Sequence, residues 1–224
     1  MPKLQKTELS SEVKKISDKI EPVSMLSLEN QFLIAMPSLA DPYFNRSVTY
    51  ICEHNEEGAM GLIINLPVNI TLSDLLKQIE PTAEEKENRA DKSENDDHID
   101  SHNSLEQLVL SGGPLAQQRG FVLHNTQQGW DSSLALSDEV MITTSKDILM
   151  ALGTDRAPEN FIVALGYAGW DAGQLEQELQ NNSWLTIPAD NDLLFNTPIE
   201  QRWKKATESL GIDLAHLSSH IGHA

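Results

Sequence analysis

Short apolar segments separated by turn residues dominate the pattern of this 224-residue chain. Alternating or continuous apolar runs of about four to eight residues, bounded by Gly, Pro, Asn or Asp, are typical of β-strands. The pattern predicts strands at residues 31–37, 47–54, 59–65, 105–111, 120–125, 134–144, 161–168 and 183–188. The chain is therefore expected to be rich in strands, with helices between some of them.

Four segments have helical spacing or helix end signals instead: residues 71–79, 145–153, 172–182 and 198–212. Thr71 or Ser73 can cap the first of them, because a hydroxyl at a helix start accepts a free backbone amide. In the last segment, Pro198 marks the start and Gly211 the end. We find no internal repeat.

The strands at 47–54 and 59–65 are separated by only four residues, "NEEG". A connection this short between two apolar strands predicts an antiparallel hairpin. Gly58 is expected to supply any positive φ that the turn requires, because it has no Cβ.

Two segments do not fit a folded core. Residues 1–24 carry apolar side chains at 4-3-4 spacing among charged ones, so they form either a short amphipathic helix or a frayed extension. Residues 82–103 carry eight acidic and three basic side chains with almost no apolar residue. We interpret this segment as a disordered acidic insertion within one domain, residues 25–224.

Composition narrows the classes of partner. The formal net charge of −18 disfavours binding to DNA and to anionic membranes, which both attract basic surfaces. Arg202, Lys204 and Lys205 form the nearest basic cluster, and a solvated helix face explains them. The single Cys excludes an internal disulfide, and neither a leader nor a membrane-spanning run is found. We expect a cytoplasmic protein.

The segment "CEHNEEGAMGLIIN" brings together a thiol, an imidazole and several carboxylates. In a regular strand Cys52 and His54 would share one face at about 6.6 Å along the strand, with Glu53 on the other. Glu56 and Glu57 also disfavour a thiolate. Cys52 and His54 are candidates for catalysis, but a cysteine packed in the core explains Cys52 more simply.

Other candidate sites have equally simple structural explanations. Gly112 and Gly113 could turn their amides toward an anion, or could merely reverse the chain before Pro114. His124 is a further ligand-binding candidate. Three histidines have a spacing that would place them on one helical face: His216, His220 and His223. They are weak candidates for binding a metal ion, because they lie at the chain end, where helices fray. No nucleotide, zinc or cofactor motif is found, so no cofactor is expected.

Trp170 follows the predicted strand at 161–168. Its ring is expected to cover the end of that strand, with Asp171 accepting hydrogen bonds from the first amides of the next helix. We interpret this region as a structural junction first and a ligand-binding rim second.

Six separated blocks resemble, in order and spacing, the bacterial AlgH/YqgE family: "FLIAMPSLADPYFNRSVTYICEHNEEGAMGLIIN", "LSGGPLAQQRGFVLH", "MITTSKDILMALGTDRAP", "ALGYAGWDAGQLEQEL", "NSWLTIPAD" and "LLFNTPIEQRW". The resemblance implies an α+β fold in which a bent, largely antiparallel β-sheet, partly closed like a small barrel, is flanked by helices. It also implies a bacterial cytosolic setting. Residues 1–24 and most of 82–103 look like additions to the family pattern.

Two functions remain open on the sequence. The family name reflects a proposed regulatory role in alginate production. This favours a non-enzymatic regulatory or binding protein, such as a transcriptional regulator. Such a protein would act through an unknown protein partner or a small ligand. The alternative is a thiol-dependent or hydrolytic enzyme using Cys52 and His54 near Gly112 and Gly113. Convergence of these residues and His124 on one pocket would favour the enzyme.

Overall fold

The computed structural model describes residues 27–39, 41–79 and 105–211. The predicted extension at 1–24, the acidic insertion at 82–103 and the three C-terminal histidines lie outside these ranges. None of the helices within the described ranges is long and apolar enough to cross a bilayer.

Strands are the main regular structure of the described chain. They are β1 (Gln31–Ala35), β2 (Val48–Asn55), β3 (Gly58–Ile63), β4 (Pro67–Thr71), β5 (Leu108–Ser111), β6 (Leu115–Asn125), β7 (Ser133–Ala135), β8 (Val140–Thr143), β9 (Phe161–Asp171) and β10 (Trp184–Pro188). The helices are α2 (Leu72–Ile79), α5 (Lys146–Ala151), α6 (Gln174–Gln180) and α7 (Arg202–Ser209). A π-helix, η1 (Asp192–Asn196), and a 3₁₀-helix, η2 (Ile199–Gln201), precede α7.

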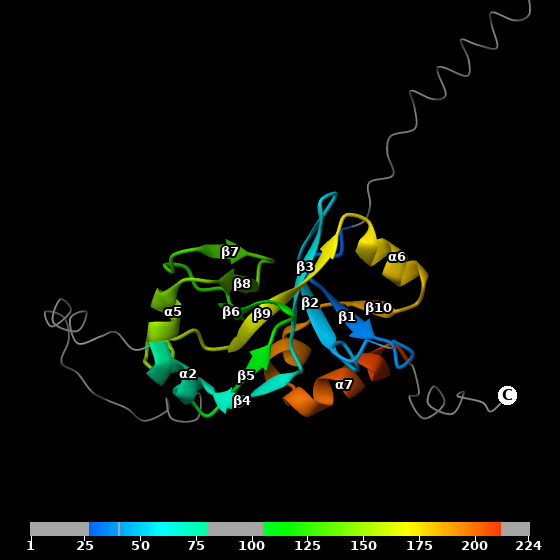
Figure 1. Cartoon of the computed structure of the whole chain (residues 1–224). Coiled ribbons are helices and arrows are strands. Elements are labelled where there is room, and N and C mark those ends of the chain that lie inside the picture. Colours follow the sequence, from blue (N-terminus) through cyan, green and yellow to red (C-terminus); the bar gives the residue numbers. More distant parts are fainter. Residues whose placement is uncertain (1–26, 40, 80–104, 212–224) are drawn as a thin grey trace, which may run out of the picture.

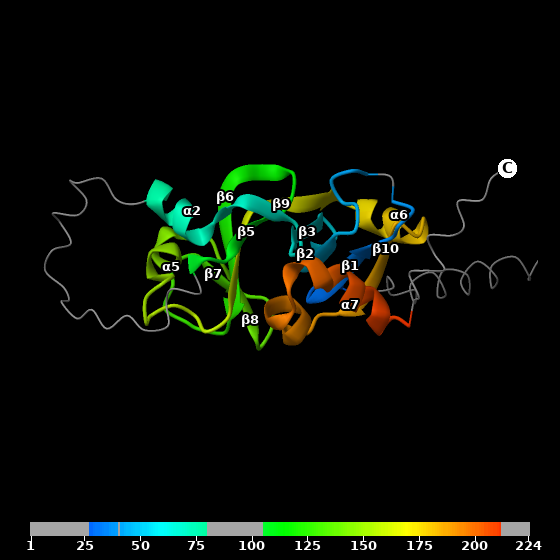
Figure 2. The same cartoon turned by 90° about the horizontal axis from the view of Figure 1, so that it is seen from below.

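The strands form one curled, largely antiparallel sheet, a half-barrel of order β10-β1-β2-β3-β9-β6-β8-β7. β5 joins it by pairing parallel with β9, and β4 pairs with β5. Helices α6 and α7 lie at the β1–β10 end, whereas α2 and α5 lie at the other end (Figures 1 and 2). The fold is therefore α+β, as the family resemblance implies.

β9 runs through the centre of the sheet and serves both of its halves. Its first part pairs with β6, and residues 168–171 pair with β3. Gly166 lies at a register shift in the pairing with β6 and has φ +74°, and a Cβ there would approach the carbonyl oxygen of Gly113 to 2.6 Å. Only glycine allows both the positive φ and this close approach of two backbones.

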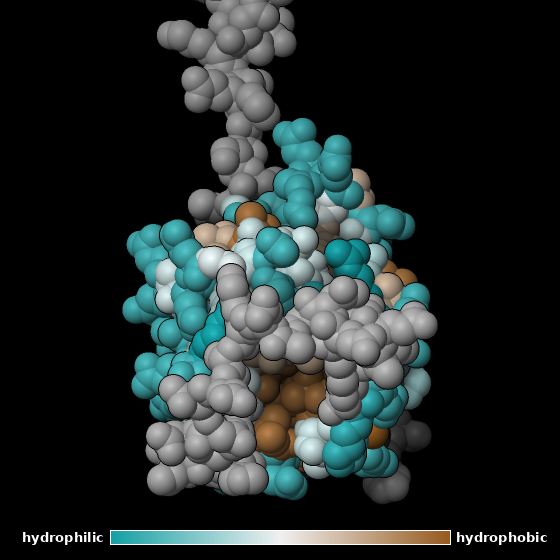
Figure 3. Space-filling view, turned by 90° about the vertical axis from the view of Figure 1, so that its left-hand side faces the viewer, coloured by the Kyte–Doolittle hydropathy of each residue, from teal (hydrophilic) through white to brown (hydrophobic). Residues whose placement is uncertain are grey.

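Alternation along the strands creates hydrophobic cores on both sides of the sheet. In β1, Phe32 and Ile34 face the core that also holds Trp203 of α7. Leu33 and Ala35 face the opposite side, toward Leu175 of α6. A third core joins α2 and α5 to the sheet. The side of the molecule that carries these two helices has a hollow in which hydrophobic residues are visible (Figure 3).

The local predictions are largely confirmed. β2 and β3 form the expected hairpin, and Gly58 has φ +138°. The hydroxyl of Thr71 accepts the amide of Asp74 at 3.2 Å, as a helix cap does. Two elements were not predicted: β4, whose "PVNIT" begins with proline, and the π-helix η1, which has no simple sequence period. The single strand predicted at 134–144 is wrong, because a turn divides it into the antiparallel strands β7 and β8.

Candidate functional site

A β-bulge separates Cys52 from His54. Across the hairpin Ile51 pairs with Gly61, but Glu53 pairs with Met60, so Cys52 is an extra residue in β2. Such an insertion shifts the alternation of every side chain that follows it. The prediction that Cys52 and His54 share a face is therefore wrong.

Cys52 is a packed core residue. Its side chain lies in the same cluster as Tyr50 and is 7% exposed, and its thiol donates to the backbone oxygen of Tyr50 at 3.8 Å. Burial raises the pKa of the thiol far above its ordinary value, and the charge of Glu53 acts in the same direction. A thiol held in its neutral form is a poor nucleophile.

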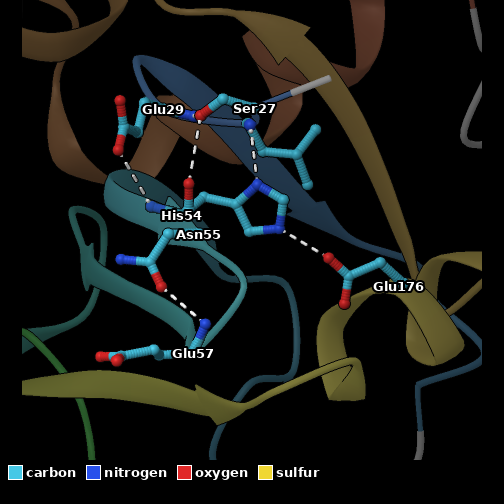
Figure 4. Close-up of polar contacts among 7 residues, drawn as sticks. Ser27, Glu29, His54, Asn55, Glu57 and Glu176 are labelled. Carbon is cyan, nitrogen blue, oxygen red and sulfur yellow. Dashed lines mark hydrogen bonds and ion pairs between the residues drawn. The ribbon is translucent and has the colours of Figure 1, made fainter. Parts of the chain in front are cut away.

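His54 lies on the other side of the strand and holds three segments together (Figure 4). Its Nδ1 accepts the backbone amide of Leu28 at 3.0 Å. Because that nitrogen is an acceptor, Nε2 carries the proton and donates to Oε1 of Glu176 in α6 at 2.7 Å. The backbone of His54 is also fixed, since Glu29 accepts its amide at 3.3 Å. Both ring nitrogens are occupied, so the geometry is that of a structural contact.

The amide of Gly112 is already used within the sheet, where it donates to the oxygen of Leu165 at 2.8 Å. Gly113 has φ +156°, and a Cβ there would collide with the backbone of Tyr167. Both glycines thus allow the chain to pass close against β9. This agrees with a structural role in the path of the chain rather than with anion binding by their amides.

His124 is fully buried between two strands. Its Nδ1 donates to the oxygen of Asn125 at 2.8 Å, and its Nε2 lies 2.9 Å from the hydroxyl of Thr143 in β8. Burial lowers the pKa of His124 below its ordinary value, although the bond to Asn125 opposes this. The ring is therefore neutral at pH 7 and acts as an internal link between β6 and β8.

Trp170 is 6% exposed and packs against Trp184 with ring centroids 6.0 Å apart. Both indole nitrogens donate to Oε2 of Glu178, at 2.9 and 2.8 Å. The expected cap by Asp171 is wrong, because the residue before α6 is Gly173 and no side chain caps it. Asp171 still belongs to β9, where its amide donates to the side chain of Gln174 at 3.0 Å.

Trp170 also borders a small concave region of about 170 Å³ beside the tip of the β2–β3 hairpin. A much larger cleft of about 740 Å³ lies elsewhere, between the starts of β5 and β9 and the η1–α7 segment. Neither region is lined by Cys52, His54, Gly112 or His124. The convergence that would favour a thiol-dependent enzyme is therefore not found in these two regions.

The larger cleft is the candidate functional site. Apolar side chains line it from three distant parts of the chain: Leu108, Leu110, Phe161, Ile162, Phe195 and Ile199. Glu106 and Glu159 are exposed residues of its lining. The described lining includes neither Cys, His nor Ser, and the hydroxyl of its Thr197 donates to the oxygen of Asp192 at 2.8 Å. The arrangement suits binding better than nucleophilic catalysis.

Arg202 is the cation of the cleft and is only 5% exposed. Its Nε donates to the oxygen of Thr197 at 3.0 Å, and its Nη1 donates to the oxygen of Ile64. Burial lowers the pKa of the guanidinium to about 10, partly opposed by the charge of Glu200. The interpretation of Arg202 as part of a solvated helix face is wrong, whereas Lys204 and Lys205 are exposed.

Sequence reasoning missed this cleft because its walls come from three segments up to about 90 residues apart, and hydrophobic periodicity gives no information on such long-range contacts. One signal was present: Arg202 begins α7 directly beside the buried Trp203, on the turn that faces the sheet. Within the described ranges, no three or more His, Cys, Asp or Glu side chains are grouped to hold a metal ion.

Comparison with known proteins gives consistent results. A family model described as AlgH-like matches residues 32–215. A UPF0301 protein of Colwellia psychrerythraea is 73% identical over 210 residues, covering 89% of this chain and all of that protein. A UPF0301 protein of Photobacterium profundum is 54% identical with the same coverage.

Solved structures agree with the fold. The solution structure of the AlgH protein from Pseudomonas aeruginosa has a TM-score of 0.67 at 42% identity, covering 90% of this chain and 98% of that one. A crystal structure from Corynebacterium diphtheriae, 21% identical, has a TM-score of 0.61 over 87% of this chain and 93% of that one. The family match, the relatives and the fold coincide, and the chain belongs to the AlgH-like family of bacterial proteins.

Proposed function

We propose that this protein is a non-enzymatic, cytoplasmic binding protein with a regulatory role, which acts through a small ligand held in the cleft beside Arg202. The observation that carries the proposal is the cleft itself: about 740 Å³ of concave space, lined by both apolar and polar side chains, with one buried cation. Small-molecule sites are likewise concave and combine hydrophobic and aromatic side chains with polar groups that fix the ligand's orientation.

The chemistry of the cleft supports binding over catalysis. Cysteine is the most nucleophilic residue type, and Cys52 is the single cysteine of the chain. Its thiol is packed in the core, where burial raises its pKa. The two histidines that the structure describes at candidate positions, His54 and His124, use both ring nitrogens in internal contacts. None of these three residues lines the cleft.

The proposal is tested by presenting the full chain with a fractionated extract of small bacterial metabolites and detecting bound compounds by ligand-observed NMR. An Ile199→Trp variant adds bulk inside the cleft, so it should lose the bound compounds. Leu134→Trp is the matched control, because Leu134 is 59% exposed on the edge strand β7. It should bind them as the parent does.

Two results would contradict the proposal. Compounds that bind both variants equally would place the binding site outside the cleft. Conversion of a compound to product, abolished by Cys52→Ala or by Ile199→Trp, would make the protein an enzyme.

A further inference from the structure

Among the described residues, Arg202 carries a buried charge without a carboxylate within 4.0 Å. Within the described ranges, the acidic groups that lie within 4.0 Å of a basic one pair with His54, Lys77, Lys204 and Lys205. A buried guanidinium is costly unless it is paired, and carbonyl dipoles compensate it only in part. In the part of the chain that the structure describes, the guanidinium therefore has no carboxylate paired directly with it, although the charge of Glu200 acts on it from nearby.

The guanidinium also retains hydrogen-bonding capacity. Its two bonds to described residues use Nε and Nη1, which leaves Nη2 without an acceptor among them. The described polar atoms that are fully enclosed and lack a partner are those of Ser47, Thr49 and Trp130, and Nη2 is not among them. Since Arg202 lines the cleft, Nη2 is available to a ligand there.

The remaining lining restricts the ligand further. About half of the lining residues are apolar, and Leu110, Phe161 and Ile162 among them are at most 7% exposed and packed in the cores. Glu106 and Glu159 add negative charge to the lining, and the whole chain carries −18. Repulsion by these carboxylates rises with ligand charge, so a dianion such as a phosphate monoester is disfavoured.

We propose that the cleft binds a monoanion with an apolar body, whose single carboxylate pairs with Nη2 of Arg202 while the body fills the space between the β5 and β9 starts and η1. The inference rests on the proposed binding function and specifies its ligand class. The bond would be charge-assisted, and it would be stronger here than in water because the guanidinium is already desolvated.

The test is a titration of the isotopically labelled full chain with three probes of similar apolar length: hexanoate, hexanamide and hexyl phosphate. Amide shifts locate the bound probe, and the cleft residues Leu108, Phe161 and Ile199 are expected to respond. Hexanoate should bind about tenfold or more tightly than hexanamide, and more tightly than hexyl phosphate.

Variants separate the charge from the cavity. Arg202→Met keeps a long apolar side chain and should reduce the affinity for hexanoate to that for hexanamide, which itself should not change. Lys204→Met is the matched control, because it removes an exposed cation of the same helix that pairs with Glu208 and does not line the cleft. If Arg202→Met does not fold, Arg202→Lys is used instead. This variant keeps the positive charge but loses the planar set of guanidinium donors, so it should lower the affinity for hexanoate and leave the affinity for hexanamide unchanged.

The outcomes distinguish this inference from the binding function. Equal binding of hexanoate and hexanamide in the cleft would overturn the anionic ligand class and leave a binding protein for neutral compounds. Tighter binding of hexyl phosphate would replace the monoanion by a dianion. Absence of hexanoate binding up to its solubility would also overturn the inference, while the metabolite screen still decides on the function. Unchanged hexanoate affinity in the Arg202 variants would remove Arg202 from the site.

Discussion

Nε2 of His54 lies 2.7 Å from Oε1 of Glu176, although the two residues are 122 positions apart in the chain. The contact joins the β2–β3 hairpin to α6, and the same imidazole holds the amide of Leu28. One side chain thus connects the start of the described chain, the hairpin and a late helix. Removal of this side chain should therefore remove contacts from all three segments.

We expect His54→Ala to lower the free energy of unfolding by about 2–3 kcal/mol, because it leaves the amide of Leu28 and the carboxylate of Glu176 without partners in a poorly solvated place. Glu176→Gln should cost about 1 kcal/mol or less, since its side-chain oxygen still accepts from Nε2. Chemical denaturation measures both. The exposed Glu53→Ala is the control, and an equally small effect of all three would show that the contact contributes little.

Trp170→Ala should lower the free energy of unfolding by about 3–5 kcal/mol, through the lost aromatic burial and the cavity that remains. The variant also removes one of the two indole donors to Glu178. Asp171→Ala, one residue on, is the control and should change stability by about 0.5 kcal/mol or less, because that residue is exposed and caps no helix. A Trp170→Ala variant with the same melting temperature as the parent would contradict the interpretation of this region as a structural junction.

The thiol of Cys52 should react with dithionitrobenzoate only as fast as the protein opens. Its pKa is raised by burial, so the thiolate fraction of the folded state is negligible at pH 8. In denaturant the same thiol should react within seconds to minutes. Rapid reaction of the folded protein, at a rate that follows reagent concentration, would show an accessible thiol and reopen the enzymatic alternative.

His124 should make stability depend on pH below neutrality. Its folded pKa is lowered from the ordinary value of 6.5, so the unfolded chain binds the proton more readily. The contribution is fully present above pH 6.5 and is lost as pH falls through the folded pKa. Denaturation midpoints between pH 7.5 and 5 should therefore fall less in His124→Asn than in the parent. Parallel curves for the two proteins would contradict the assignment.

The charge of −18 predicts that the protein does not retard random duplex DNA in a gel near physiological ionic strength. Salt provides the internal control, because phosphate-mediated binding strengthens steeply as salt is lowered. Retardation that is tight and salt-dependent would show a hidden basic face and would change the proposed mode of action.

How much of the fold could be predicted depended on how local its causes are. Gly58 and Thr71 were placed correctly because a turn and a helix cap are determined by a few adjacent residues. The bulge at Cys52 was not, because it results from the register between β2 and β3 and moves His54 to the other side of the sheet. A two-residue spacing alone does not report such a shift.

The candidate site was the least predictable part for the same reason. Arg202 stands beside Lys204 and Lys205 in the sequence, where the three look alike. What distinguishes Arg202 is contact with the oxygens of Thr197 and Ile64, one of them 138 residues away. The resemblance to AlgH/YqgE sequences implied the sheet and its helices, but it carried no assigned ligand residue to these positions.

The central strand β9 has a mechanical consequence. One half of the sheet is attached to it through β5 and β6, and the other half through β3. Neither half can come away without breaking hydrogen bonds of the same eleven-residue strand. Amides in the middle of β9 should therefore exchange with solvent only when the whole sheet opens, which makes this strand the last part of the molecule to lose its protons to deuterium.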